Sequence, residues 1–444
     1  MDDAEALVPK YLTRQVDLPI TLYEGEMEAV HVGRGSIRLE WLPTPRLVFV
    51  VETETIEPID VALTAPTPIP IGMSDISANT TGIITGTETR LGAPGVGSQV
   101  IRGFAHTISI GEDEALSRVQ FHVPNFPSFI GGHIERRDGE GKAAWNGRLQ
   151  VDDGTWSVTL DLVQNHRELM RDLRDVGGYA LTAVGDLRRA DQAAFSVSNA
   201  REILEMISYW LVFLAGQWTQ PVLLVGYSAS DEQVFEEWRS PRVDPWMARR
   251  SVFPEFIREK SRVREPNLRP TFGAMRKDWS DPILRDSLIW AISWLMDSGK
   301  AVSADTSLVL SQAGLELLAW DRLVVRGNMN ARKFRNLEAY EAIARLLKHM
   351  NIDPRLPNGT MLNELHLFAK GFGGNGPRAL TRVRNSIAHP RKGASRPSAQ
   401  MRIEASRLGL WYLELAILRL LDYSDSYLNR LRSWHPERVP WVKK

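Results

Sequence analysis

The chain has 444 residues, and its 54 Lys and Arg side chains equal its 54 Asp and Glu side chains, so the formal net charge is zero. This length exceeds that of a single ordinary hydrophobic core and predicts two or three domains. The absence of cysteine excludes disulfides, thiolate catalysis and the commonest zinc sites, and it favours a reducing compartment.

The start of the chain is not expected to be a secretory signal. Acidic residues follow Met1 where a secretory leader would be basic and then apolar. The apolar runs along the chain are too short to cross a bilayer. We therefore expect a soluble, cytoplasmic protein without membrane contact.

Residues 17–194 carry mainly strand signals, which are short β-branched or alternating runs between Gly- and Pro-rich turns. Turns are expected at Gly33-Arg34-Gly35, at residues 43–45, at residues 92–97 and at residues 152–154. The pattern predicts an antiparallel β-sandwich or barrel. The expected strands are residues 30–32, 36–42, 46–51, 60–63, 81–85, 105–110, 119–123, 145–150 and 156–162.

The middle of the chain is mixed. Residues 198–214 have the apolar spacing of a helix, residues 220–227 resemble one buried strand, and residues 231–269 are interpreted as a charged connector with short helices. We therefore expect three domains: a β-rich sensor or regulatory domain over residues 1–195, a connector over residues 196–270, and a helical domain over residues 271–444.

Long helices follow residue 271. Ser280-Asp281-Pro282 opens the first, which Gly299 closes, and Asp305 or Thr306 caps the second. His349 and His366 lack partners at metal spacing and are expected to be structural or to line a cleft. Further helices are predicted at residues 331–350, 362–369, 377–389 and 400–428. The expected fold class is α+β multidomain, with an all-α bundle at the C-terminal end.

Gly371–Gly376 matches the G-x-G-x-x-G pattern of dinucleotide-binding loops, but its surroundings do not. A helix precedes it where a strand is required, Pro377 follows the last glycine, and no acid stands about 20 residues further on. We interpret this stretch as a loop that positions the next helix, and we expect no cofactor.

The net charge of zero conceals an asymmetry. Residues 301–444 hold 23 Lys and Arg against 12 Asp and Glu, whereas residues 1–300 hold 31 against 42. A basic cluster suits a polyanion such as RNA, although a solvated helix face accounts for it equally well. The candidate RNA-binding residues are Lys370, Arg378, Arg382, Arg391 and Lys392.

The stretch Arg384-Asn385-Ser386-Ile387-Ala388-His389, followed by Pro390, is the candidate catalytic motif. A proline cannot continue a helix, so His389 is expected at the helix C-terminus. At about 3.6 residues per turn, Asn385 and His389 lie roughly 40° apart, whereas Arg384 and His389 lie roughly 140° apart. The bland interpretation is that His389 caps the helix and Arg384 is solvated.

This motif resembles the R-x4-6-H signature of HEPN domains, with a polar residue after the arginine and an Ile-Ala-His-Pro ending. The predicted helix 306–318 resembles the HEPN helix that carries an inward-facing acid, here Glu316. The resemblance covers about residues 280–430. A β-rich half joined to such a domain is similar to the ApeA group, which implies a role in antiphage defence by abortive infection.

The resemblance implies an endoribonuclease that needs no metal and whose site forms across a homodimer. Such a site would use Arg384, His389, Asn385 and Glu316 to catalyse attack of an RNA 2′-hydroxyl on the adjacent phosphate, with tRNA a plausible substrate. A phage-derived trigger would act on the N-terminal domain. The alternative is a catalytically inactive HEPN-like module that binds RNA or a protein, and the β-rich half could itself recognise a carbohydrate or a phage protein.

Overall fold

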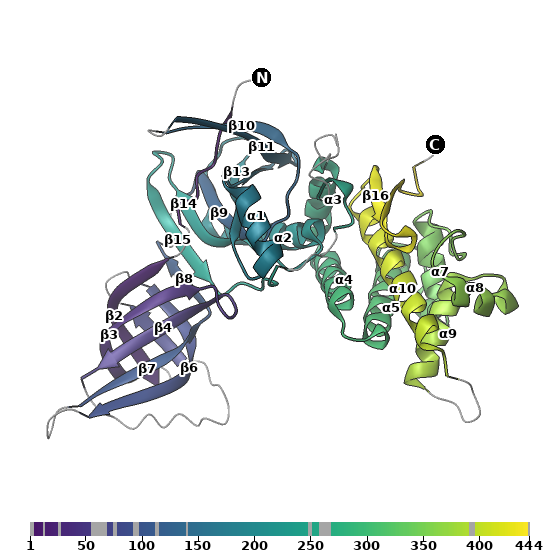
Figure 1. The fold of residues 1–444 in the computed structure, drawn as a ribbon, viewed down its shortest axis with the longest axis horizontal. Helices are drawn as coiled ribbons and strands as arrows, with labels where there is room; N and C mark the ends of the chain where they lie inside the picture. Colours follow the sequence, from purple (N-terminus) through teal and green to yellow (C-terminus); the bar gives the residue numbers. More distant parts are fainter. Residues whose placement is uncertain are drawn as a thin grey trace. The chain divides into compact units, whose positions relative to one another are not determined.

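The computed structural model describes residues 4–11, 14–24, 28–54, 69–73, 78–91, 97–111, 115–138, 141–246, 251–256, 268–389 and 396–442. The chain divides into two compact units. Unit 1 comprises Met1–Leu211, Trp218–Ala248 and Arg262–Glu265, and unit 2 comprises Val212–Gln217, Arg249–Ser261 and Pro266–Lys444. The division into three domains stays a prediction. Antiparallel sheets build unit 1 and helices dominate unit 2 (Figure 1), which confirms the predicted α+β multidomain class.

Unit 1 contains a closed antiparallel barrel with the strand order β2-β3-β4-β7-β6-β5. Its interior is filled by buried apolar side chains, among them Ile37, Phe49 and Ile101. Alternation along each strand places these residues inside and the charged residues outside. The strands are β2 (Gln15–Glu24), β3 (Glu28–Glu40), β4 (Arg46–Thr53), β5 (Ile69–Met73), β6 (Ala78–Leu91) and β7 (Gly97–Ala105).

The turn predicted at Gly33-Arg34-Gly35 is wrong, because β3 runs through it without interruption and joins two predicted strands. A Cβ atom on Gly33 would lie 2.1 Å from the carbonyl oxygen of Glu52, and one on Gly35 would lie 2.3 Å from that of Val50. The two glycines therefore allow close approach of β4 rather than a reversal of the chain. The strand predicted at residues 60–63 lies outside the described residues.

A nine-stranded sheet completes the β-structure of unit 1, in the order β1-β10-β11-β12-β13-β9-β14-β15-β8. The predicted helix at residues 198–214 is confirmed, whereas α1 and β15 were not predicted. The elements are β1 (Ala4–Glu5), β8 (Thr107–Ile110), β9 (Arg118–Pro124), β10 (Gly132–Asp138), β11 (Gly141–Asp152), β12 (Trp156–Leu162), α1 (His166–Val176), β13 (Leu181–Arg189), α2 (Val197–Ala215), β14 (Val222–Tyr227) and β15 (Gln233–Arg239).

In unit 2, helix α5 packs between α4 and α10. The helix predicted over residues 331–350 is two helices, α6 and α7, because Glu338 and Glu341 form a capping box that starts a new helix. The helix predicted over residues 400–428 ends at Leu420, and a strand follows at Ser426–Asn429. Helix α3 and the C-terminal hairpin that contains this strand were not predicted. The elements are α3 (Arg269–Trp279), α4 (Pro282–Lys300), α5 (Ala304–Trp320), α6 (Ala331–Arg335), α7 (Ala339–His349), α8 (Asn363–Ala369), α9 (Gly376–Ala388), α10 (Ala399–Leu420), β16 (Ser426–Asn429) and β17 (His435–Arg438).

The helix α5 does not end as an ordinary α-helix. A π-helical turn, η3 (Asp321–Val325), directly continues it. Such turns carry an extra residue and are frequent at functional sites.

In the part of the chain that the structure describes, no helix combines the length and the apolar character that crossing a membrane requires.

Candidate functional site

Helix α9 carries the predicted motif, and its first turn is held firmly. The Asn375 side chain accepts a hydrogen bond from the backbone N–H of Arg378 at 2.8 Å, and Pro377 occupies the first turn. The Gly376 N–H donates to the carbonyl oxygen of Pro354 at 2.8 Å. The buried Tyr412 hydroxyl donates to the same oxygen at 3.1 Å. The predicted start of this helix near Pro377 is confirmed.

The other end of α9 falls where Pro390 predicts it. Ala388 is the last helical residue, and His389 is the C-terminal cap with φ −133° and ψ 69°. The His389 N–H still donates to the Asn385 carbonyl oxygen at 2.8 Å. The inner face of the helix buries Ala379, Leu380 and Val383 against its neighbours α5, α7 and α10. The capped first turn and the buried inner face therefore fix the helix that presents His389.

The three motif side chains occupy different environments. Asn385 and His389 are exposed, whereas Arg384 is half-buried. One Arg384 Nη1–H donates to Asn385 Oδ1 at 3.2 Å. The side chain of His389 has no hydrogen-bond or ion-pair partner among the described residues, and Arg384 does not contact it. The helix thus joins Arg384 to Asn385, and no described residue bonds the imidazole.

Glu316 lies on α5, which is a neighbour of α9. Its carboxylate oxygen Oε1 accepts a hydrogen bond from Gln312 Nε2 at 2.7 Å, one turn earlier on the same helix. The side chain is half-buried. No contact between Glu316 and either Arg384 or His389 occurs among the described residues, so a single chain does not bring the predicted acid onto the motif.

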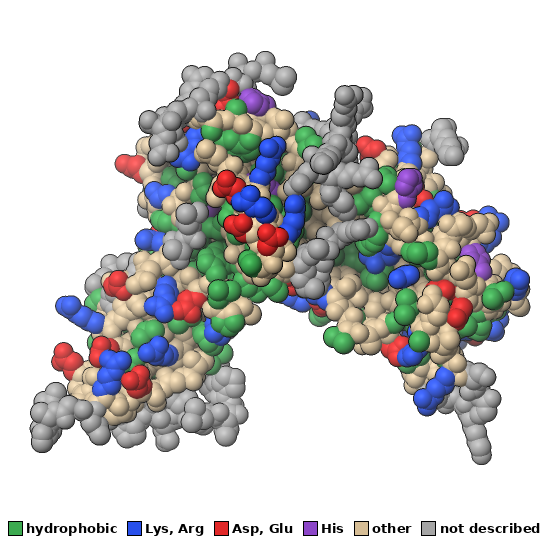
Figure 2. All heavy atoms as spheres, viewed as in Figure 1, with side chains coloured by type: hydrophobic (Ala, Val, Ile, Leu, Met, Phe, Trp, Pro, Cys, Tyr) green, Lys and Arg blue, Asp and Glu red, His purple; other side chains and the backbone are tan. Residues whose placement is uncertain are grey.

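Two of the predicted RNA-binding arginines stack on an aromatic ring. The Arg382 guanidinium lies 4.8 Å from the centre of the Phe372 ring, and that of Arg378 lies 5.4 Å from the same ring and 5.3 Å from Tyr340. Lys370 is exposed near the same ring. Figure 2 shows Lys and Arg side chains at the end of unit 2 where Figure 1 labels α9.

The ring of Phe372 was not predicted as part of the site, because its loop was interpreted only as a spacer. Its position two residues after Lys370 was the available signal, since an aromatic residue among basic residues is typical of nucleic-acid surfaces. Arg391 and Lys392, the other two predicted RNA-binding residues, lie outside the described residues.

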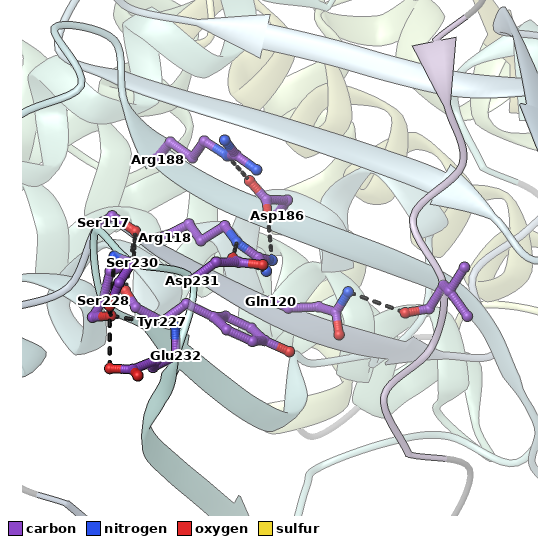
Figure 3. Close-up of polar contacts among 11 residues, drawn as sticks. Ser117, Arg118, Gln120, Asp186, Arg188, Tyr227, Ser228, Ser230, Asp231 and Glu232 are labelled. Carbon is purple, nitrogen blue, oxygen red and sulfur yellow. Dashed lines mark hydrogen bonds and ion pairs between the residues drawn. The ribbon is translucent and has the colours of Figure 1, made fainter.

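A second polar cluster stands in unit 1 on strands β9, β13 and β14 (Figure 3). The Arg118 guanidinium lies 3.7 Å from the centre of the Tyr227 ring and bonds Asp231 at 2.6 Å and Asp186 at 3.4 Å. Arg188 bonds the other oxygen of Asp186 at 2.5 Å. Oppositely charged neighbours meet each of these charges, so we assign the cluster to the stability of the sheet.

Comparison with known proteins places this architecture in a family. Residues 111–249 match the YopA central domain, and residues 281–440 match the YopA C-terminal domain. The chain belongs to the YopA family. The SPbeta prophage-derived uncharacterized protein YopA of Bacillus subtilis (strain 168) is 26% identical over 461 residues, which cover 98% of each chain. No solved structure matches the chain.

The YopA C-terminal match contains Glu316, the basic residues around Phe372, and α9 with Arg384, Asn385 and His389. The YopA central match contains the polar cluster of Figure 3. Neither family description names an activity. The family therefore describes the architecture of the chain, and the HEPN resemblance of the motif stays a prediction.

Proposed function

We propose that this chain is an endoribonuclease effector that cleaves RNA by attack of a 2′-hydroxyl on the adjacent phosphate. The observation that supports it best is the position of His389. Its exposed imidazole ends a firmly packed helix, has no described partner, and lies within about one turn of the coupled Arg384 and Asn385 side chains.

The reaction requires three groups. A base removes the proton from the 2′-hydroxyl, an acid protonates the 5′-oxygen that leaves, and a cation stabilises the charge that develops on the phosphate. Imidazole suits both proton transfers near neutral pH, and the planar guanidinium of Arg384 suits phosphate oxygens. One chain supplies a single His389, so two copies related by a two-fold axis would supply the base and the acid.

The substrate would run along α9. Arg378 and Arg382 would contact the RNA backbone. The Phe372 ring would hold both guanidinium groups, whose planes can also stack on bases. Lys370 adds a further cation at that end. Single-stranded loops expose bases for stacking, so a structured RNA with accessible loops, such as tRNA, is the substrate class that we propose.

The biological setting that we propose is antiphage defence. The relative from Bacillus subtilis is named as prophage-derived, and a prophage gains when a cell infected by a competing phage stops supporting replication. Uncontrolled RNA cleavage would also kill the host. We therefore assign the β-rich part of the chain a regulatory role, in which a phage-derived trigger releases the activity.

The test compares the wild type with His389→Ala and His435→Ala. His435 is also exposed in unit 2 but stands on β17, away from the motif in sequence. Loss of an acid–base group lowers the cleavage rate by about 10²-fold or more, so we expect His389→Ala to abolish RNA cleavage and growth inhibition in cells, and His435→Ala to retain both. Equal cleavage by the wild type and His389→Ala would refute the assignment.

The second candidate is a non-catalytic RNA-binding module, which the stacking of Arg378 and Arg382 on Phe372 favours. In this case the double variant Arg378→Gln/Arg382→Gln would lose RNA binding in a filter assay. The wild type would bind RNA but would not cleave it in infected cells, and His389→Ala would bind as the wild type does.

A further inference from the structure

A polar pocket of about 210 Å³ lies in unit 2 and shares no residue with the motif. Four separate segments line it: the last turn of α3, the π-helical turn η3 with its cap, the end of α7, and the end of α10. A water molecule takes about 30 Å³ of liquid, so the pocket has room for a small molecule. Its charged lining residues are Lys277, Asp278, Arg322, Arg326, Arg419 and Asp422, and His349 joins them.

A buried carboxylate organises the floor of this pocket. Arg322 Nη2 and Arg326 Nη2 each lie 2.7 Å from a different oxygen of Asp278, whose side chain is 6% exposed. The Arg322 side chain is 13% exposed and that of Arg326 is 30% exposed. Asp278 thus holds two guanidinium groups in fixed positions, and each keeps further N–H donors. Among the described residues, Arg322 Nε has no hydrogen-bond partner.

Positive charge exceeds negative charge at the lining. Lys277, Arg322, Arg326 and Arg419 stand against Asp278 and Asp422. Lys277 is exposed and has no ion pair among the described residues, and Arg419 has only Asp422 at 3.4 Å. Four cations therefore line one small volume. We call Arg322 and Arg326, which bond Asp278, the floor of the pocket, and Lys277 and Arg419 its rim.

Asp321 is a further acid next to the two floor arginines. Its carboxyl is buried, its Oδ1 has no described hydrogen-bond partner, and it interacts with Arg322, Arg326, Asp278 and Asp281. Burial raises the pKa of Asp321 to about 6, although the two arginines oppose the shift. At pH 7 Asp321 is therefore mainly ionised and offsets part of the charge of the two floor arginines, so the positive excess of the pocket depends on Lys277 and Arg419 at its rim.

Helix ends explain only part of the cluster. Lys277 and Arg419 stand in the last turns of α3 and α10, where the helix dipole favours cations. Arg322 and Arg326 belong to the π-helical turn and its cap, and their position depends on Asp278. The lining still carries more cations than anions, because Lys277 has no ion pair among the described residues.

We propose that this pocket binds the phosphate groups of a small phosphorylated molecule. Arg322 and Arg326 bind the phosphate oxygens at the floor, and Lys277 and Arg419 close over them from the rim. Guanidinium groups suit phosphate because their paired N–H donors match its oxygens. The site is separate from the α9 motif, so it stands whether or not the chain cleaves RNA.

The test is calorimetric titration of the full chain with inorganic pyrophosphate and, in a second arm, with ADP. The double variant Lys277→Gln/Arg419→Gln removes the rim and leaves the Asp278 ion pairs intact. Its matched control is Arg345→Gln/Lys348→Gln, which removes two exposed cations from α7 outside the pocket. We expect the Kd for pyrophosphate to rise about tenfold or more in the rim variant and to change less than about twofold in the control.

The two arms identify the source of the phosphate. Binding of ADP as tight as that of pyrophosphate assigns a nucleotide, whereas binding of pyrophosphate alone assigns a free inorganic anion. Circular dichroism checks that the variants fold. If the double variant does not fold, the single variant Lys277→Gln, which loses no described ion pair, takes its place. No binding by the wild type, or equal loss in rim and control variants, overturns the proposal.

Discussion

At the scale of single residues, His122 shows how burial sets a protonation state. The ring lies inside unit 1, with Nδ1 3.0 Å from the carbonyl oxygen of Leu223. A carbonyl oxygen only accepts, so Nδ1 carries the proton, and Nε2 accepts from the Tyr11 N–H at 3.3 Å. Both nitrogens are satisfied in the neutral ring. Burial lowers the pKa of His122 to about 4.

This lowered pKa predicts acid sensitivity. An exposed histidine in the unfolded chain binds a proton below pH of about 6.5, whereas folded His122 resists it until about pH 4. The contribution of neutral His122 to the free energy of unfolding is therefore fully present above pH 6.5. It is lost as the pH falls toward 4, by up to about 3 kcal/mol. Denaturant unfolding at pH 7, 5.5 and 4.5 measures it.

The comparison uses His122→Asn and, as a control, His106→Asn at an exposed position. We expect the first variant to be less stable at pH 7 and to lose less stability than the wild type on acidification. The control should keep the wild-type dependence on pH. Parallel pH curves for the wild type and His122→Asn would contradict the assignment.

At the scale of elements, the start of α9 depends on a missing side chain. A Cβ atom on Gly376 would lie 2.2 Å from the Tyr412 hydroxyl oxygen and 3.1 Å from the Pro354 carbonyl oxygen. Tyr412 is buried in α10 and cannot withdraw freely. Gly376 therefore permits the close packing that fixes the helix carrying Arg384 and His389.

We expect Gly376→Ala to lower the free energy of unfolding by about 1 to 3 kcal/mol, because overpacking displaces the Tyr412 hydroxyl. The control is Gly371→Ala in the same loop, where an added Cβ meets no atom within 4 Å and the effect should stay within about 0.5 kcal/mol. Adding Tyr412→Phe should restore part of the loss. An unchanged unfolding midpoint for Gly376→Ala would show that the Tyr412 hydroxyl moves aside at little energetic cost.

At the scale of the whole molecule, the proposed chemistry requires two chains. Arg384 and His389 do not meet within one chain, whose helix geometry holds them on different faces. We propose that Arg384 of one subunit acts with His389 of the partner subunit. A mixed dimer of wild-type and His389→Ala chains then lacks one of the two imidazoles that serve as base and acid.

Refolding the wild type together with an equal amount of His389→Ala should therefore lower RNA cleavage to about a quarter of the level of the same total amount of wild type, since only a quarter of the dimers carry both imidazoles. His389→Ala alone should stay inactive. The measurement is the initial rate of cleavage after unfolding and refolding the mixture together. Cleavage at half of the wild-type level, with mixed dimers verified by mass, would contradict a site that both subunits share.

The elements that sequence reasoning located correctly are those with local signals. Pro377 and Pro390 mark the ends of α9, Asp281 and Pro282 mark the start of α4, and strand β12 has the predicted bounds. A proline or an N-terminal cap acts on the backbone within a few residues, so its effect is readable from the chain itself. The charge asymmetry that suggested a polyanion is also a property of the sequence alone.

Packing between distant segments decided the rest. In the sequence alone, Gly33 and Gly35 resemble a turn, but in the fold β4 packs against them. Phe372 likewise resembles part of a spacer, but Arg378 and Arg382 stack on its ring. The polar pocket of unit 2 joins four segments that no motif connects. The sequence by itself determined where α9 begins and ends and which polar side chains it carries. Only the tertiary structure decided which groups meet, because a contact depends on a distance in space that local sequence patterns do not record.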